Sequence, residues 1–268
     1  MSDAVLTEAV RPGIRRVTLN RPERLNAMNY GLVAGLYEAL DDAAADPTCR
    51  VIVLTGAGRG FCAGLDLTEG ATPPGGPPTS RPQAGMTVQK FIAGLVPKMR
   101  SVPQPIIAAV NGPASGGGLA LALASDIRIA AASARFNVAF IRVGLSGCDI
   151  GVSWMLPRLV GASRAFELLL TGRLIDAAEA DRIGLVTRVV PDGNVVDSAL
   201  ETAELIVNNS PFGVRMTKEV MWSQLEIGSL QAGIDLENRT QILSSFTGDI
   251  EEATAAFAQK RPPRFTTR

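Results

Sequence analysis

Residues 51–64 read VIVLTGAGRGFCAG, a short apolar run that passes directly into a glycine-rich turn. The same arrangement returns at residues 106–118, which read IIAAVNGPASGGG. A short, continuously apolar run is typical of a strand that is buried on both faces of a parallel sheet. Glycine permits positive φ and a close approach of the backbone to a ligand, so both turns can present free N–H groups. Together the two units predict an α/β fold.

The segments around these units alternate between strand and helix patterns. In chain order we predict a strand at 14–19, helices at 30–45, 86–100 and 119–125, and a strand at 127–130. From residue 151 onwards the pattern is mostly helical, with an interruption at 185–190 and a final segment at 250–265. Residues 71–85 are rich in proline and glycine and predict a mobile surface loop. Alternating elements followed by a helical end indicate an α/β core with a helical C-terminal region.

The composition excludes several kinds of site. The chain contains no histidine, which rules out Ser-His-Asp and Cys-His catalysis and histidine-ligated zinc. Its three cysteines, Cys49, Cys62 and Cys148, lack the spacing of a disulfide framework or of a four-thiolate metal site. The 26 Lys and Arg residues balance 26 Asp and Glu residues, so no net field favours nucleic acid or an anionic membrane. We therefore expect a cytoplasmic protein without a metal, a nucleic-acid partner or a membrane partner.

Two glycine-rich turns that face one point would form an oxyanion hole, and a helix N-terminus behind either turn would add partial positive charge. Glycine-rich turns also occur in α/β folds without any ligand, and that alternative stays open for either turn taken alone. Phosphate binding is disfavoured, because neither turn has a Gly-Lys-Ser/Thr ending or the Gly-x-Gly-x-x-Gly spacing.

Several motifs, taken together and in order, resemble one family. They are NRPERLNAM at 20–28, GFCAGLDL at 60–67 and NGPASGGG at 111–118, followed by LTGR at 170–173, AAEA at 177–180 and GLV at 184–186. The resemblance is to the enoyl-CoA hydratase/isomerase (crotonase) superfamily and covers nearly the whole chain. It implies a crotonase-like (ClpP/crotonase) α/β fold, with repeated ββα units over residues 1–200 and a helical trimerisation region over residues 201–268. It also implies a homotrimer or a dimer of trimers.

The resemblance implies the site as well. In that family two backbone amides stabilise the enolate-like oxygen of a thioester, and by position these are the N–H groups of Ala63 and Gly117. The substrate is an acyl-CoA thioester, so coenzyme A is part of the substrate and no other cofactor is expected. Residues expected beside it are Arg24, Ala27, Ala63, Asp66, Leu67 and Phe140, with Phe257 and Lys260 reaching it from the C-terminal helix of a neighbouring subunit. Arg24 and Lys260 can equally be solvated surface charges.

The chain departs from the family at the two carboxylates of a hydratase. One of them activates water and the other delivers a proton to Cα. In typical hydratases of the family, the first carboxylate lies two residues after the triple-glycine turn, where this chain has Ala120. The second carboxylate lies four residues before the glycine aligned with Gly144, where this chain has Phe140. Neither residue can transfer a proton, so the hydratase pair is absent.

Asp149 is the carboxylate that remains. It corresponds to an acidic position that some family isomerases use, and residues 149–158 resemble the Δ3,Δ2-enoyl-CoA isomerases and the ring-opened phenylacetate-pathway isomerase. One base suffices to shift a double bond, since the proton leaves one carbon and returns to another. Asp149 also precedes a predicted helix, so a role as N-cap stays open beside the role of base.

Three functions follow from these residues. We expect an enoyl-CoA isomerase that uses Asp149 as its single acid/base. The alternatives are a hydratase in which Asp149 and another acid substitute for the missing pair, and a non-catalytic acyl-CoA-binding protein. Cys62 and Cys148 are expected to pack near the site as small hydrophobic residues, and Glu69 is a weaker candidate for the acyl pocket.

Overall fold

The computed structural model of the chain describes residues 3–72 and 80–265. Its centre is a six-stranded sheet in which the first pair of strands is antiparallel and every later pair is parallel. The order across this sheet is β1 (Val5–Arg11), β2 (Ile14–Leu19), β3 (Val51–Gly56), β4 (Ile106–Val110), β6 (Ile127–Ala131) and β9 (Arg188–Val190). A second, three-stranded sheet contains β5 (Ala114–Ser115), β7 (Arg135–Asn137) and β8 (Ile175–Asp176).

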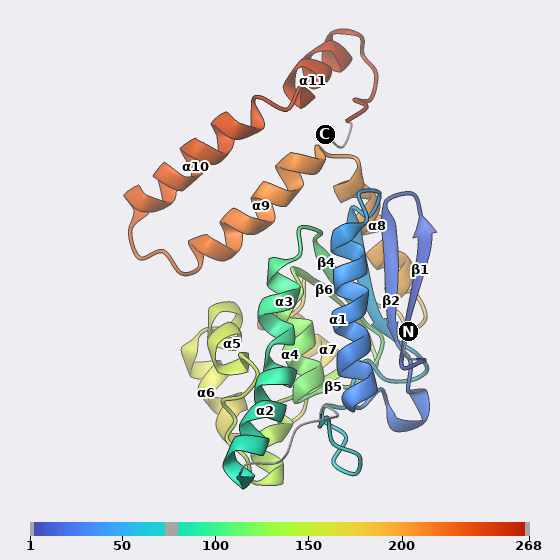
Figure 1. Cartoon of the computed structure of the whole chain (residues 1–268), viewed down its shortest axis with the longest axis vertical. Coiled ribbons are helices and arrows are strands. Elements are labelled where there is room, and N and C mark those ends of the chain that lie inside the picture. The colour runs from blue at the N-terminus through green and yellow to red at the C-terminus, as the bar shows by residue number, and fades with distance from the viewer. Residues whose placement is uncertain (1–2, 73–79, 266–268) are drawn as a thin grey trace.

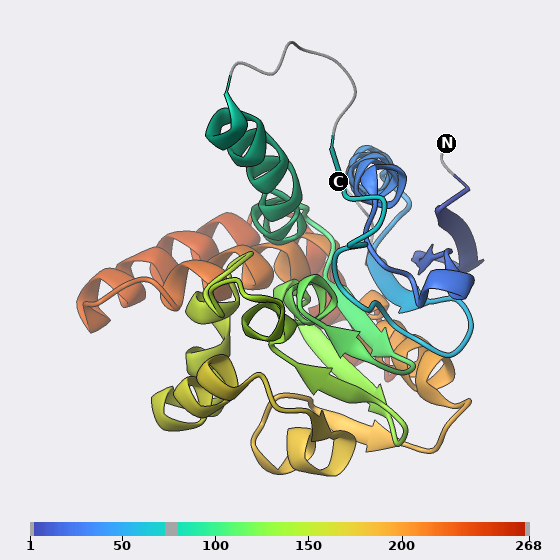
Figure 2. The ribbon, with the colours of Figure 1, turned by 90° about the horizontal axis from the view of Figure 1, so that it is seen from below.

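Helices cover both faces of the larger sheet, as the apolar runs of β3 and β4 require. Every residue of these two strands is buried. The helices of the core are α1 (Tyr30–Ala45), α2 (Arg81–Ala93), α3 (Leu95–Ser101), α4 (Gly117–Ala124), α5 (Val152–Val160), α6 (Ala162–Thr171), α7 (Ala177–Arg182) and α8 (Val195–Val207). One buried cluster joins α1, α3, α4 and α5 to one face of the sheet, and a second cluster joins α8 to the other face. Figure 2 shows α1 and α8 on opposite sides of the sheet.

The C-terminal helices leave this core as an arm. They are α9 (Pro211–Gln224), α10 (Leu230–Ser244) and α11 (Asp249–Ala258), and they extend away from the sheet (Figure 1). The boundary that we placed after residue 200 falls inside α8, whose buried Leu200 and Ala203 pack in the core. No helix among the described residues is both long enough and apolar enough to cross a membrane.

Most predicted elements are present, and one helix differs. The single helix predicted at 86–100 is two helices, α2 and α3, which meet at Gly94. Pro97 explains the break, because it has no N–H to donate to the carbonyl of Ala93 and its ring would clash with that carbonyl in a continuous helix. A side chain at Gly94 would also meet the hydroxyl of Tyr37. Helix α2 starts earlier than predicted, since Ser80 caps it.

The loop predicted at residues 71–85 is therefore wrong in part. Residues 81–85 belong to α2, and residues 73–79 lie outside the described part of the chain. The strand β1 was not predicted, although it pairs with β2 from Val5 to Arg11 with one register shift between Ala9 and Arg11. Its outward side chains are mostly exposed, so its apolar pattern is weak.

Candidate active site

The two glycine-rich turns lie in direct backbone contact. A Cβ at Gly112 would overlap the carbonyl oxygen of Arg59, and a Cβ at Gly118 would overlap that of Cys62. The N–H of Ser115 donates to the carbonyl of Cys62 at 2.9 Å. The second turn thus requires glycine at these two positions, because the backbone of the first turn occupies the space that a Cβ would need.

Asn111 locks the two turns together. Its Oδ1 accepts a hydrogen bond from the N–H of Gly56 at 3.1 Å, and its Nδ2 donates to the carbonyls of Gly56 and Gly58 at 2.9 Å. A third contact reaches the carbonyl of Gly60 at 3.2 Å. From the sequence, Asn111 was predicted only as the first residue of a turn. Its position at the end of a buried strand, before a glycine-rich turn, was the signal that could have indicated its role in joining the two turns.

The hydrogen bonds of the first turn show which of its amides is free. The N–H of Ala63 donates to the carbonyl of Leu25 at 3.0 Å, so it is not available to a ligand. The prediction of Ala63 as an oxyanion donor is therefore wrong. The N–H of Leu65, two residues further on, has no hydrogen-bond acceptor within residues 3–72 and 80–265. Leu65 replaces Ala63 as the candidate donor.

Gly64 sets the direction of the Leu65 amide. The N–H of Ala63 and the carbonyl of Gly64 both face the 25–28 segment, and the carbonyl accepts from the N–H of Met28 at 2.7 Å. In a regular strand, consecutive residues face opposite sides. Gly64 breaks that alternation with a φ of 97°. The N–H of Asp66 then returns to the carbonyl of Met28 at 2.9 Å, which leaves the Leu65 N–H facing away from this segment.

Gly117 supplies the second free amide. It is the first residue of α4, so its N–H has no partner inside the helix, and no acceptor is found for it elsewhere in the described chain. A Cβ added to Gly64 would lie 3.5 Å from the Gly117 nitrogen, which places the two turns edge to edge at this point. The start of α4 also carries partial positive charge from the aligned peptide dipoles. An oxygen bearing negative charge would be stabilised between Leu65 and Gly117.

The walls beside these amides are apolar. The Cε1 atom of Phe140 lies 3.3 Å from where a Cβ of Gly116 would be, and the Cδ1 atom of Ile150 lies 3.6 Å from that of Gly117. Ala120, one turn into α4, is fully buried. Ala120 and Phe140, the two positions where the resemblance would place the carboxylates of a hydratase, are thus both buried and apolar.

Asp149 precedes Ile150 and is half-buried. Its Oδ1 accepts two hydrogen bonds, one from the side-chain amide of Gln89 and one from the N–H of Ile150 at 2.8 Å. For Oδ2 no hydrogen-bond partner is found in the described residues. The N-cap of α5 is Gly151, without any side-chain cap, so the interpretation of Asp149 as a helix cap is wrong.

Ile150 has a left-handed backbone, with a φ of 45°. This conformation is an outlier for a β-branched residue and costs on the order of 1–3 kcal/mol. The side chain of this residue packs against the start of α4, with its Cδ1 atom 3.6 Å from where a Cβ of Gly117 would be. Strain of this kind is concentrated where the surrounding structure fixes a functional geometry.

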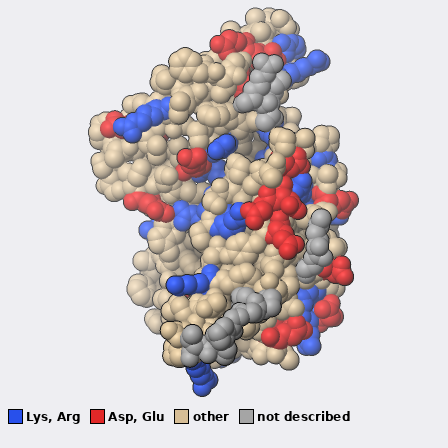
Figure 3. All heavy atoms as spheres, in the orientation of Figure 1, with Lys and Arg blue, Asp and Glu red and all other residues tan. Residues whose placement is uncertain are grey.

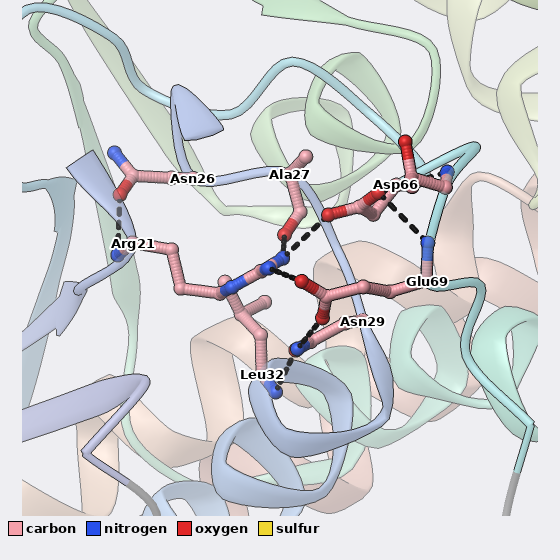
Figure 4. A network of polar contacts seen from close by, with 8 residues as sticks. Arg21, Asn26, Ala27, Asn29, Leu32, Asp66 and Glu69 are labelled. Carbon is pink, nitrogen blue, oxygen red and sulfur yellow. Dashed lines mark hydrogen bonds and ion pairs between the residues drawn. The ribbon is translucent and has the colours of Figure 1, made fainter. Parts of the chain in front are cut away.

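A buried arginine supports the first turn from behind (Figure 4). Arg21 donates through Nη1 to the carbonyl of Ala27 at 2.6 Å and to Asp66 at 3.0 Å, and through Nη2 to Glu69 at 2.8 Å. Glu69 also accepts from the Nδ2 of Asn29 at 2.7 Å. Both carboxylate oxygens of Glu69 therefore have a partner in this network.

Asp66 is a member of the same network. Its side chain is 5% exposed, and its Oδ1 accepts from the N–H groups of Thr68 and Glu69. The hydrogen bond from Glu69, followed by that from Thr68 and the contact with Arg21, lowers the pKa of Asp66. All these bonds are internal, so Asp66 holds the turn in place.

The other predicted residues lie as follows. Arg24 and Leu67 are exposed near the first turn, and Ala27 is buried. Phe257, in α11, and Lys260, just after it, are exposed on the arm (Figure 1). The arm carries both away from the turns of their own chain, and their contact with a nucleotide stays a prediction.

Two of the cysteines differ sharply in environment. Cys62 is fully buried under the turns, and burial raises the pKa of its thiol to about 12, so it acts as a small hydrophobic residue as predicted. Cys148 is exposed, so the prediction that it packs as a hydrophobic residue is wrong. In the described residues no group of three or more acidic or cysteine side chains could hold a metal ion.

A cavity of about 1270 Å³ lies between the core and the arm. Its lining includes Asp126 and Trp154 from the core and Lys218 and Trp222 from α9. Asp126 accepts from Trp222 at 2.7 Å, pairs with Lys218 at 3.0 Å and accepts from the N–H of Ile106 at 2.7 Å. Asp126 is thus structural, and the lining of the cavity does not include the two turns.

Comparison with known proteins gives consistent matches over the whole chain. The model of a family described as enoyl-CoA hydratase/isomerase matches residues 10–268. A probable enoyl-CoA hydratase of Mycobacterium tuberculosis is 45% identical over 98% of this chain and 92% of its own length. The 1,2-epoxyphenylacetyl-CoA isomerase of Escherichia coli is 42% identical over 96% of each chain.

Solved structures show the same similarity. A probable enoyl-CoA hydratase/isomerase from Mycobacterium abscessus superposes with a TM-score of 0.93 at 40% identity, covering 99% of both chains. A monofunctional enoyl-CoA isomerase from M. smegmatis superposes with a TM-score of 0.73 at 43% identity, covering 87% of this chain and 98% of the other.

Proposed function

Because the chain belongs to the enoyl-CoA hydratase/isomerase family and has the crotonase-like fold, we propose that it is an enoyl-CoA isomerase with Asp149 as its single acid/base. The observation that carries this proposal is the set of groups beside the two turns. The N–H groups of Leu65 and Gly117 and the Oδ2 of Asp149 are unpaired in the described structure, whereas the two hydratase positions are Ala120 and Phe140.

In the proposed reaction the thioester oxygen lies between the Leu65 and Gly117 amides. Oδ2 of Asp149 removes a proton from the carbon next to the carbonyl, and the C–H electrons form the double bond of an enolate. The negative charge collects on the oxygen, where each preorganised N–H donor is worth about 3 kcal/mol in the transition state. The enolate then re-forms the carbonyl, and the carbon–carbon double bond moves to the position conjugated with it. The carbon at the distal end of the original double bond takes the proton back from Asp149.

Hydration of a 2-enoyl-CoA is the second candidate, and the relatives named as hydratases favour it. It requires one group to activate water and another to protonate Cα. Glu69, the nearby acid that could have served, is bound by Arg21 and Asn29. One free carboxylate oxygen suits a reaction in which the same proton leaves and returns.

The decisive experiment is Asp149→Asn assayed in deuterated water with 3-enoyl-CoA and 2-enoyl-CoA substrates. Removing a general base costs about 10²–10⁴-fold in rate, so we expect double-bond migration to fall by that amount with normal folding. Asp181→Asn, at an exposed position of α7, is the matched control and keeps full activity. Full activity in Asp149→Asn would exclude Asp149 as the base.

The same assay separates the remaining alternatives. Gain of water by a 2-enoyl-CoA without double-bond migration would identify a hydratase, and binding without any turnover would identify a non-catalytic acyl-CoA-binding protein. The identity to the 1,2-epoxyphenylacetyl-CoA isomerase makes ring-bearing acyl-CoA thioesters the second substrate class to include. Coenzyme A is part of each substrate, and the proposed chemistry uses no other cofactor.

We also propose that the arm assembles the chain into a trimer or a dimer of trimers. Its surface is largely uncharged in the view of Figure 3. Large apolar side chains stand out from it, among them Leu230 at 82%, Phe246 at 82% and Phe257 at 87% exposure. Several large apolar side chains exposed along one arm favour a protein–protein contact, because soluble proteins rarely leave extensive apolar surface in water. In such an assembly Phe257 and Lys260 would reach the site of a neighbouring subunit. We expect the protein in the cytoplasm.

A further inference from the structure

We infer that Gln89 is a positioning residue for Asp149, an inference that rests on the proposed role of Asp149 as the base. Gln89 lies on α2, sixty positions away in sequence, and its Nε2 donates to Asp149 Oδ1. The N–H of Ile150 donates to the same oxygen at 2.8 Å. Two donors on one carboxylate oxygen leave the other oxygen, Oδ2, to accept the proton.

The helix that carries Gln89 is anchored on its other side. The ring of Phe91 stacks between Tyr30 and Tyr37 of α1, with centroid distances of 5.5 Å to each. The hydroxyl of Tyr37 also donates to the carbonyl of Phe91 at 2.9 Å. Apart from this contact α2 buries little, since Ile92 is its one buried residue. Gln89 is therefore presented from a point on α2 that α1 holds in place.

The chemistry of the two side chains explains why such a partner is needed. The terminal torsion of aspartate has a broad energy minimum, so a backbone bond to the next residue does not by itself fix the plane of the Asp149 carboxylate. The Gln89 amide adds a second, distant point of attachment. Because an amide has no proton to exchange with a carboxylate, it fixes Oδ1 without competing for the proton at Oδ2.

The test is Gln89→Met, which keeps the length of the side chain and its helix propensity but removes the donor. We expect kcat to fall by about 10²-fold with KM unchanged, the size of effect that follows a displacement of about 1 Å in a reacting group. The primary deuterium isotope effect on kcat should rise, because proton transfer becomes slower relative to the other steps. Gln83→Met, the same substitution in the first turn of α2, should leave kcat, KM and the isotope effect unchanged.

A double-mutant cycle shows whether Gln89 acts through Asp149. In the Asp149→Asn background, Gln89→Met should have no further effect on the residual rate, because the carboxylate that it positions is gone. An equal loss of rate in both backgrounds would overturn the inference and show that Gln89 only supports the fold, as would an unchanged kcat in the single variant. Failure of the proposed function is a different result, namely full activity of Asp149→Asn itself.

Discussion

Gly64→Ala is the substitution that most directly tests the arrangement of the oxyanion amides. Gly64 has a φ of 97°, and an added Cβ would lie 2.9 Å from the carbonyl oxygen of Ser115. An L side chain in a left-handed backbone costs about 1–2 kcal/mol, and the close contact adds to that cost. The chain can relieve both by returning to negative φ. That rotation restores the alternation of the strand and turns the Leu65 N–H away from Gly117.

The catalytic effect of this change can be estimated from the loss of one donor. Removing one oxyanion-hole donor costs about 3–4 kcal/mol, which corresponds to a fall of about 10²–10³-fold in kcat. The assay is the rise in absorbance as a 3-enoyl-CoA becomes the conjugated 2-enoyl-CoA, followed across substrate concentrations. Thermal unfolding of the same samples gives the stability change separately.

Gly70→Ala is the matched control. Gly70 closes the same turn with a φ of 66°, and its N–H donates to the carbonyl of Asp66 at 2.8 Å, but a Cβ there meets nothing within 4 Å. It should lose about 1 kcal/mol of stability through backbone strain alone and keep its kcat. If Gly64→Ala kept the wild-type kcat, or if both variants lost activity in proportion to their stability, the role given to the Leu65 amide would be refuted.

Two further predictions concern thiols and acid stability. At neutral to mildly alkaline pH an alkylating agent should label the exposed Cys148 rapidly and the other two cysteines only after unfolding. The reason is that burial raises the thiol pKa of Cys49 to about 11 and that of Cys62 to about 12. Mass spectrometry that finds two labelled sites in the folded protein would contradict this. The pKa of Asp66 is lowered in the folded state, so its contribution to stability is complete above its unfolded pKa near 3.8 and is lost as pH falls through the lower folded value. Asp66→Asn should therefore flatten the loss of unfolding free energy below about pH 4. An unchanged acid slope in denaturant titrations would show that the hydrogen bonds from Glu69 and Thr68 and the contact with Arg21 do not stabilise the ionised Asp66.

The core elements could be predicted from sequence because each rests on a local signal. Residues 51–54 and 106–110 are continuously apolar, and both are strands buried on two faces. Helix α1 begins and ends where its pattern predicted, with Asn29 capping it at 2.9 Å. The break at Gly94 was missed because the helical pattern continues across it. Pro97 carried that information, and its position inside the predicted helix should have outweighed the apolar spacing.

The site was predicted less accurately, and the reason is physical. The motif at 60–67 forms a turn that contacts the second glycine-rich turn, but neighbouring amides of one extended segment face opposite sides, and a single positive φ reverses them. Whether Ala63 or Leu65 presents its N–H depends on the backbone of Leu25 and Met28, which lie in an earlier and separate segment of the chain. The partner of Asp149 was missed for a similar reason, since Gln89 lies on a helix that only the folded chain brings alongside.

In a chain without histidine, the proposed proton transfer depends on which polar groups beside the two turns are left without a partner. Around the two turns, Asp66, Glu69, Asn111 and the Ala63 amide are engaged in internal hydrogen bonds. Within residues 3–72 and 80–265, the N–H groups of Leu65 and Gly117 and the Oδ2 of Asp149 have no hydrogen-bond partner, and the neighbouring side chains of Phe140 and Ile150 are apolar. Two donors suit one developing oxyanion, and one acceptor suits one proton. The proposal of an isomerase over a hydratase therefore depends on this one free carboxylate oxygen, since Ala120 and Phe140 stand where the resemblance would place the two acids of a hydratase.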